Sequence, residues 1–343
     1  MRHLLNTLFV MSPGAALFKE GETVEVKVGN ETKMKIPIHT LGGIVILGNI
    51  YCSPPLLAFC AENQVGVSFL SEYGRFWARV TGPVSGNVLL RKEQYRRSDD
   101  LERSADISRS IVLAKIANCR NVLQRDLRDH PDGFGREELQ AAIERMASII
   151  SKLSEARSLD IVRGYEGEAG NLYFGVFDHL IHAQKNDFFF RSRNRRPPTD
   201  RMNSLLSFLY TLLTHDVASA LEAVGLDPAV GFLHRDRPGR PGLALDLMEE
   251  LRPFLPDRLA LSLVNRIQLR GKHFDVTETG VVLIEADARK EILTAYQARK
   301  QEEITHPYLG EKIRIGLLPF IQAMLMARHL RGDLDGYPPF IWK

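Results

Sequence analysis

Cysteine is scarce in this sequence. The 343 residues include only three cysteines, at Cys52, Cys60 and Cys119, and none of them forms a CxxC pair. An odd number of scattered thiols, with no secretory signal ahead of them, is typical of a protein from the reduced cytosol. We therefore expect the three side chains to pack as small apolar groups and the protein to be cytoplasmic.

Long apolar runs and an excess of one charge are also missing. The longest apolar run, TLGGIVILGNIY, is shorter than the roughly 20 residues that a membrane-spanning helix needs, so no membrane partner is expected. Lys and Arg number 45 against 42 Asp and Glu, a net charge of +3, and this balance alone does not indicate a polyanionic partner. The sequence lacks a GxxxxGK[ST] loop, a GxGxxG fingerprint, a GxSxG elbow and an HExxH motif, which counts against nucleotide hydrolysis and serine chemistry.

The hydrophobic pattern predicts a β domain at the N-terminus. Short β-branched runs are separated by Gly, Asn and Pro, and Val24, Val26 and Val28 alternate with polar residues as in a half-buried strand. One helix is expected in SPPLLAFCAENQ, where Ser53 can cap the first turn and Pro54 suits the first helical position.

From about residue 98 the apolar residues recur at helical spacing instead. Helices are expected throughout this part, including one over LALDLMEELRPF. We therefore predict an α+β fold with a small N-terminal β domain (1–90), a linker (91–100) and a larger all-α domain (101–343).

The helical part contains one imidazole and three carboxylates that can converge. Asp246 and Glu249 are three residues apart and share a face if their segment is helical. The loop RDRPGRPG lets the chain reverse and bring His234 over that face, while the glycines beside Glu166 allow a close backbone approach. Imidazole nitrogen with carboxylate oxygens, and no thiolate, suits Mg²⁺ or Mn²⁺.

Each of these signals also has a simpler explanation. Acids three apart on a helix usually form a solvated face, a histidine beside a loop is more often a packing or surface residue, and Glu166 between glycines can bridge a turn. The apolar neighbours of Asp246 and Glu249 favour a buried face instead.

Arginine is concentrated in two stretches. RSRNRRPPTDR includes Arg193, Arg195 and Arg196, and the Pro/Gly loop adds Arg235 and Arg237. Guanidinium groups bind phosphates through paired hydrogen bonds, so these clusters indicate a nucleic-acid groove. A solvated loop that caps the next helix is an equally good explanation of the first stretch.

Several long motifs resemble those of one known family along nearly the whole chain. They are GRFWARVTGPVSGNVLLRKEQYRRSDD, RGYEGEAGNLYF, RNRRPPTDRMNSLLSFLYTLL, GLDPAVGFLH, LALDLMEELRP and RGDLDGYPPFIWK. The sequence is similar to the CRISPR-associated endonuclease that integrates new spacers, the larger of the two universal adaptation proteins, and in particular to its subtype I-C branch.

The resemblance implies a β domain through which members form homodimers, followed by a helical domain. It implies that Glu166, His234 and Glu249 hold a catalytic Mg²⁺ or Mn²⁺ and that Asp246 is a further acid near the ion. It also implies antiviral defence, in which the 3′-hydroxyl of prespacer DNA attacks a phosphodiester of a repeat target, with the smaller adaptation protein (Cas-two) as partner. Glu168, where the family often has a small residue, is a minor difference near the metal motifs.

Two other functions are consistent with the same residues. A branched-DNA repair nuclease would use the same ion but would not need the partner protein or a repeat-containing target. A non-catalytic DNA-binding scaffold would leave Asp246 and Glu249 in solvent, would use His234 for packing, and would bind no divalent ion.

Overall fold

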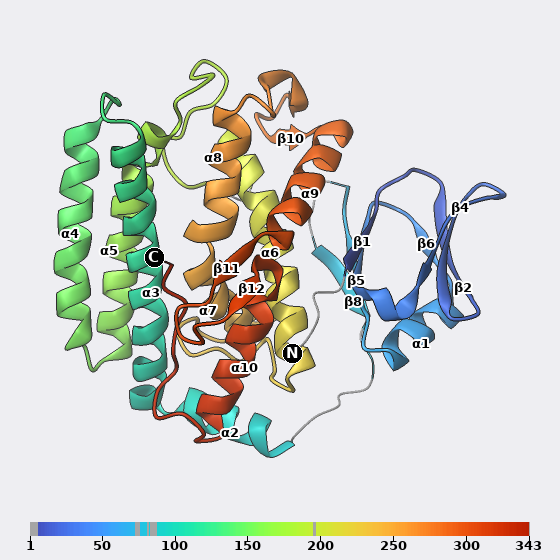
Figure 1. Cartoon of the computed structure of the whole chain (residues 1–343), viewed down its shortest axis with the longest axis horizontal. Coiled ribbons are helices and arrows are strands. Elements are labelled where there is room, and N and C mark those ends of the chain that lie inside the picture. The colour runs from blue at the N-terminus through green and yellow to red at the C-terminus, as the bar shows by residue number, and fades with distance from the viewer. Residues whose placement is uncertain (1–5, 73–75, 81, 83–87, 195–196, 343) are drawn as a thin grey trace. The chain divides into compact units, whose positions relative to one another are not determined.

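The chain divides into two compact units. The computed structural model describes residues 6–72, 76–80, 82, 88–194 and 197–342 (Figure 1). The first unit is Met1–Gly86 and the second is Asn87–Lys343. Helix α2 (Val88–Asp99) covers most of the segment for which a linker was expected. The boundary between the two units, after Gly86, therefore lies before that segment.

The N-terminal unit is built from two four-stranded sheets and one helix. One sheet has the strand order β4-β3-β2-β6, with bounds Glu31–Pro37, Thr23–Val28, Ala15–Glu20 and Tyr51–Cys52. The other has the order β1-β5-β7-β8, with bounds Asn6–Val10, Leu41–Leu47, Gly66–Leu70 and Phe76–Val80. Strands β2, β3 and β4 are antiparallel, whereas β1, β5 and β7 pair in parallel. The predicted β domain is confirmed.

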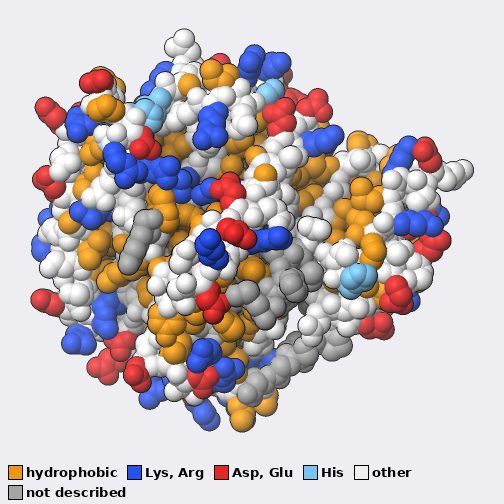
Figure 2. All heavy atoms as spheres, in the orientation of Figure 1, with side chains coloured by type: hydrophobic (Ala, Val, Ile, Leu, Met, Phe, Trp, Pro, Cys, Tyr) orange, Lys and Arg blue, Asp and Glu red, His pale blue; other side chains and the backbone are white. Residues whose placement is uncertain are grey.

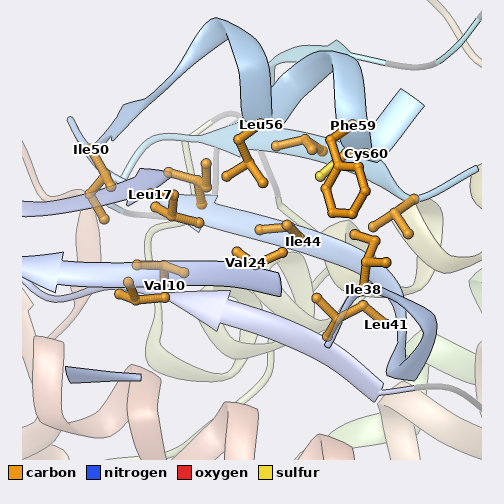
Figure 3. Packing of buried hydrophobic residues seen from close by; sticks show 14 of the residues in the cluster. Val10, Leu17, Val24, Ile38, Leu41, Ile44, Ile50, Leu56, Phe59 and Cys60 are labelled. Carbon is orange, nitrogen blue, oxygen red and sulfur yellow. The ribbon is translucent and has the colours of Figure 1, made fainter. Parts of the chain in front are cut away.

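Helix α1 (Pro54–Glu62) is the helix expected in this unit, and it packs against both β2 and β7. Ser53 caps it by accepting a hydrogen bond from the backbone N–H of Leu56 at 3.4 Å. Its buried residues Leu56 and Phe59 point into the same apolar cluster as Leu17 and Ile44 of the strands (Figure 3). The helix thus closes the core of the N-terminal unit.

The three cysteines are free thiols. Burial raises the pKa of Cys52 to about 12 and that of Cys60 to about 11. It also raises the pKa of Cys119 well above its usual value. Thiols that stay protonated are poor nucleophiles and metal ligands, so their expected role in packing agrees with their surroundings.

The C-terminal unit is mostly helical. After α2, its longer helices are α3 Leu101–Asp129, α4 Arg136–Ser154, α5 Leu159–Gly175, α6 Arg201–Ala223, α7 Gly242–Leu251, α8 Arg258–Asn265, α9 Ala286–Gln301 and α10 Leu318–Leu330. Short turns of other helix types are η2 Phe177–Leu180, η3 Pro253–Asp257, η4 Gly271–His273 and η5 Ile315–Leu317. Helices α3, α4 and α5 lie side by side (Figure 1).

Two small hairpins show that the prediction of an all-α domain was wrong in detail. Strands β9 (Phe274–Val276) and β10 (Val282–Ile284) form one, and β11 (Glu303–Thr305) and β12 (Lys312–Arg314) form the other. Each strand has three residues, which is too short for an alternating hydrophobic pattern to be recognised.

Helix α6 was also missed in the search for apolar runs. It has 23 residues and is long and apolar enough to cross a membrane, but 61% of its apolar window is buried inside the structure. It contacts α7 and α10, as the core helix of a folded domain does. Basic and acidic side chains are both spread over the visible face of this unit (Figure 2), in line with the small net charge.

Candidate metal centre

Helix α7 places Asp246 and Glu249 inside the C-terminal unit. Their side chains are 0% and 2% exposed. The alternative in which both acids form a solvated face is therefore wrong. The first N–H group of the helix, that of Gly242, donates to the carbonyl of Ala229 at 3.0 Å. The preceding loop thus caps α7 and lies directly against it.

Two glycines make this close approach possible. A Cβ atom at Gly231 would lie 2.7 Å from the carbonyl carbon of Gly242 and 2.8 Å from Asp246 Oδ2. Gln94 of α2 supports the same loop from the other side, donating to the carbonyls of Asp227 and Val230 at 2.8 Å each. The predicted chain reversal over α7 is confirmed, although its support by Gln94 was not anticipated.

Asp246 holds His234 in place. Its Oδ1 lies 2.6 Å from His234 Nδ1 and accepts the backbone N–H of His234 at 3.0 Å. Its Oδ2 accepts the N–H groups of Phe232 and Leu233 at 2.6 and 3.0 Å. Because a carboxylate can only accept, the proton of a neutral imidazole lies on Nδ1 here, which leaves the lone pair on Nε2.

Asp246 was expected as a further acid near the ion, and its contacts favour a supporting role behind His234. Both of its oxygens are engaged by the loop and its side chain is fully buried. A histidine that binds a metal often donates its other ring N–H to a carboxylate, which fixes the tautomer and the orientation of the ring.

Lys115 of α3 joins the two glutamates that were predicted as ligands. Its Nζ contacts Glu166 Oε1 and lies 2.7 Å from Glu249 Oε2. Glu249 Oε1 lies 2.5 Å from Arg252 and 3.9 Å from His234 Nε2. Lys115 thus bridges Glu166 and Glu249, and His234 Nε2 faces the other oxygen of Glu249.

The sequence contained a signal for Lys115 that was not used. Lys115 stands midway between Ile111 and Cys119, four residues from each, on a helix face that must be buried. A lysine in a buried stripe needs partners of opposite charge, and such a residue is a candidate member of an ionic site.

The charges of this cluster favour the ionised carboxylate. Burial alone would raise the pKa of Glu249, but Arg252, Lys115 and His234 outweigh burial and lower it to about 2. Burial would lower the pKa of Lys115, but Glu249 and Glu166 raise it above the usual value. Both groups are therefore charged at neutral pH.

The donor set fits a hard divalent cation. Glu249 Oε2 is buried and faces the Lys115 ammonium at 2.7 Å. A divalent ion that binds this oxygen would replace the ammonium there. Carboxylate oxygens from Glu166 and Glu249 together with Nε2 of His234 make a ligand set that suits Mg²⁺ or Mn²⁺.

Glu166 lies within helix α5 and not in a turn. Cβ atoms added at Gly164 and Gly167 would meet no heavy atom within 4 Å among the described residues, so the close backbone approach expected there was wrong. Glu168 pairs with a different residue: its Oε1 accepts a hydrogen bond from Arg145 Nε of α4 at 2.7 Å. The second acid of this motif is thus paired away from Lys115.

The predicted arginine contacts fall into three groups. Arg193 donates to Asn203 Oδ1 at 2.7 Å and to Ser207 Oγ at 3.1 Å, which ties its loop to α6. Arg195 and Arg196 lie outside the described residues. Arg235 and Arg237 are exposed in the Pro/Gly loop.

A cleft of about 570 Å³ opens beside His234. His234 and Arg235 line one part of it, and Asp160 and Arg163 of α5 line another. Arg163 Nε also donates to the carbonyl of Leu233 at 2.8 Å, so α5 and the histidine loop are held together. The cleft gives a solvent path to the imidazole, whose side chain is 19% exposed.

The fold and the site define an α+β protein with a candidate divalent-metal centre in its helical unit. The family model described as CRISPR associated protein Cas1 matches residues 8–298. A Chlorobaculum tepidum protein named CRISPR-associated endonuclease Cas1 1 is 54% identical over 343 residues, which cover all of both chains. The chain therefore belongs to the Cas1 family.

Solved structures share the fold at lower identity. A casposase bound to an integration product matches with a TM-score of 0.85 and 21% identity over 99% of this chain and 95% of that chain. A chain of a Cas6-RT-Cas1–Cas2 complex matches with a TM-score of 0.83 and 22% identity over 99% of this chain and 36% of that chain.

Proposed function

We propose that this chain is a divalent-metal-dependent DNA endonuclease and integrase that inserts new spacers into a CRISPR array in antiviral defence. The observation that carries the proposal is the bridge that Lys115 makes between Glu166 and Glu249, with Nε2 of His234 facing Glu249. The name of the 54% identical relative and the integration product in the casposase structure support it. A subtype I-C-like identity and a cytoplasmic location are part of the same proposal.

In this proposal Glu166, Glu249 and Nε2 of His234 hold Mg²⁺ or Mn²⁺. When bound, such an ion stabilises negative charge on a phosphate that is being attacked. Asp246 keeps the proton of His234 on Nδ1, so that Nε2 faces Glu249. Before the ion binds, Lys115 holds the two glutamates together and balances their charge.

The chain's own side chains bind and orient DNA, and none of them needs to be the nucleophile. The 3′-hydroxyl of the incoming strand attacks the target phosphodiester in integration, and water attacks in cleavage. Arg235 and Arg237, exposed beside the cleft, contact phosphates, and Arg195 and Arg196 remain predicted contacts. Arg193 acts by holding its loop on α6.

The partners follow from the same proposal. The chain forms a homodimer, carries prespacer DNA to a repeat target, and works with the smaller adaptation protein Cas2. A solved complex that contains Cas1 and Cas2 supports the last point.

Strand transfer of a labelled prespacer duplex into a repeat-containing plasmid tests the function. We expect joined product with Mn²⁺ and Cas2, none in EDTA, and a loss of at least about 100-fold in Glu166→Ala, because the ion loses one of its ligands. Glu168→Ala is the matched control: it removes a carboxylate from the same helix, two residues further on, and should retain the activity.

The outcomes separate the alternatives. Full activity of Glu166→Ala, or joining in EDTA, would show that the metal site is misassigned. Cleavage of branched DNA without Cas2 and without a repeat would favour a repair nuclease. A folded protein that binds DNA but shows no divalent-ion binding by calorimetry would favour the non-catalytic scaffold.

A further inference from the structure

A second cluster of metal-binding side chains lies at the far end of α3. Asp126, His130 and His182 each offer one ligand atom, and these atoms lie within 4.8 Å of one another. Asp126 is 11 residues after Lys115 (126 − 115), about 16 Å along the helix at 1.5 Å per residue. The cluster is therefore separate from the candidate catalytic centre.

The contacts within the cluster converge on one oxygen. Asp126 Oδ1 lies 2.7 Å from His182 Nε2 and 3.3 Å from His130 Nδ1. Ligand atoms around a tetrahedral Zn²⁺ with bonds near 2.0 Å are about 3.3 Å apart. The Asp126–His130 pair is thus already at the separation that an ion would impose, whereas Asp126 and His182 are at hydrogen-bond distance and would have to move slightly apart.

The backbone around the cluster is fixed in the same arrangement. Asp126 and His130 are four residues apart on α3 and share a face of the helix. His182 follows η2, where its N–H donates to Asn265 Oδ1 at 2.9 Å. Asn265, at the end of α8, also donates to the carbonyl of Leu180 at 2.8 Å. Three elements therefore hold His182 opposite Asp126.

The cluster is open to solvent on its imidazole side. The side chains of His130 and His182 are 46% and 24% exposed, and their rings lie 3.8 Å apart. An ion could enter without unfolding, and water could complete its coordination. Two imidazoles and one carboxylate prefer Zn²⁺ and similar transition metals, in contrast to the carboxylate-rich centre around Glu249.

We infer that Asp126, His130 and His182 form a second metal site, which binds a transition-metal ion such as Zn²⁺ and ties α3 to the segment after η2. That segment leads from α5, which carries Glu166, toward the arginine stretch that begins at Arg191. The ion acts as a structural cross-link because it joins residues that are distant in sequence.

Zinc binding must be measured in a variant whose candidate catalytic centre has lost its ligands, so that an ion bound there is not counted. In the full chain, Glu166→Ala with His234→Ala removes two of the candidate catalytic ligands and serves as the background variant. Calorimetry with Zn²⁺ should give one bound equivalent, and Co²⁺ should give the visible absorption of a nitrogen-ligated site. The melting temperature of the background variant should rise with Zn²⁺.

Adding His182→Ala to the background should weaken the Zn²⁺ affinity by at least about tenfold, since the loss of even an outer partner of a ligand often costs that much. It should also abolish the Co²⁺ absorption and the rise in melting temperature. His39→Ala, which removes an exposed histidine from the N-terminal unit, is the matched control and should leave all three unchanged.

Two results would overturn the second site. One is a background variant that binds no Zn²⁺. The other is Zn²⁺ binding of equal affinity with and without His182, measured on variants whose circular dichroism shows that they are folded. Neither result bears on strand transfer by the wild type, so the second site and the proposed function fail independently.

Discussion

At the scale of single residues, the candidate centre depends on a buried cation. Lys115 satisfies two glutamates that would otherwise repel each other inside the helical unit, and its side chain is only 11% exposed. A buried charge that loses its partner is strongly destabilising. A divalent ion that binds both carboxylates must displace the Lys115 ammonium. Lys115 therefore links folding to metal binding.

Replacing Lys115 with Met tests this link. We expect the free energy of unfolding in EDTA to fall by about 3–5 kcal/mol, because Glu166 and Glu249 lose their shared partner. Mn²⁺ should restore more stability to the variant than to the wild type, since the ion takes over the neutralising role. Thermal denaturation in EDTA and in Mn²⁺ measures both effects.

Lys185→Met provides the comparison, because Lys185 forms an exposed ion pair with Asp178 and such pairs contribute little. If Lys115→Met were as stable as Lys185→Met in EDTA, the two glutamates would not depend on Lys115 for their neutralisation.

At the scale of elements, hydrophobic period and capping residues predicted most of the fold. The alternation at Val24 and Val26 marks β3, and Ser53 caps α1 as expected. The position of Glu166 within α5 was not predicted, because the glycines around it are unusual in a helix interior. They are accommodated there because α5 exposes Gly164 and Gly167 to open space, while Tyr173 and other residues bury its opposite side.

Glycine therefore has opposite roles in two elements, and a pair of substitutions distinguishes them. Gly231→Ala should lower the free energy of unfolding by about 1–3 kcal/mol, because the new methyl group overlaps Gly242 and Asp246. Gly164→Ala should raise it by about 0.5–1 kcal/mol, since alanine favours the helix and meets nothing within 4 Å among the described residues. Urea denaturation of both variants gives the comparison. A Gly231→Ala protein as stable as the wild type would mean that the loop can move off α7 without cost.

At the scale of the whole molecule, the parts that could not be predicted are contacts between residues far apart in sequence. Glu250 follows the proposed ligand Glu249, yet it accepts hydrogen bonds from Tyr337 at 2.5 Å and from the N–H of Phe340 at 2.7 Å. It thereby anchors the C-terminal segment. Sequence spacing identified Asp246 and Glu249 in α7 but not the role of the neighbouring Glu250 at the chain end, because that contact depends on tertiary packing.

The buried carboxyl of Asp257 makes the stability of the folded molecule depend on pH. Burial raises the pKa of Asp257 from 3.8 to about 6, although Tyr210 donates a hydrogen bond to it at 2.7 Å. Between about pH 4 and 6 the Asp257 carboxyl is therefore more protonated in the folded than in the unfolded state, and its contribution to stability falls as the pH rises through that range. Burial raises the pKa of Glu250 to about 7, which acts in the same direction.

Asp257→Asn separates the two contributions, because asparagine cannot ionise and its side-chain oxygen can still accept from Tyr210. Between pH 4.5 and 7.5 the wild type should lose about 2 kcal/mol more unfolding free energy than the variant, the difference expected for a carboxyl whose pKa rises from about 4 to 6 on folding. Urea denaturation of both proteins at the two pH values, in EDTA so that metal binding does not contribute, measures this difference. Parallel losses in the two proteins would show that Asp257 is ionised in the folded state at both pH values, and that its bond to Tyr210 outweighs its burial.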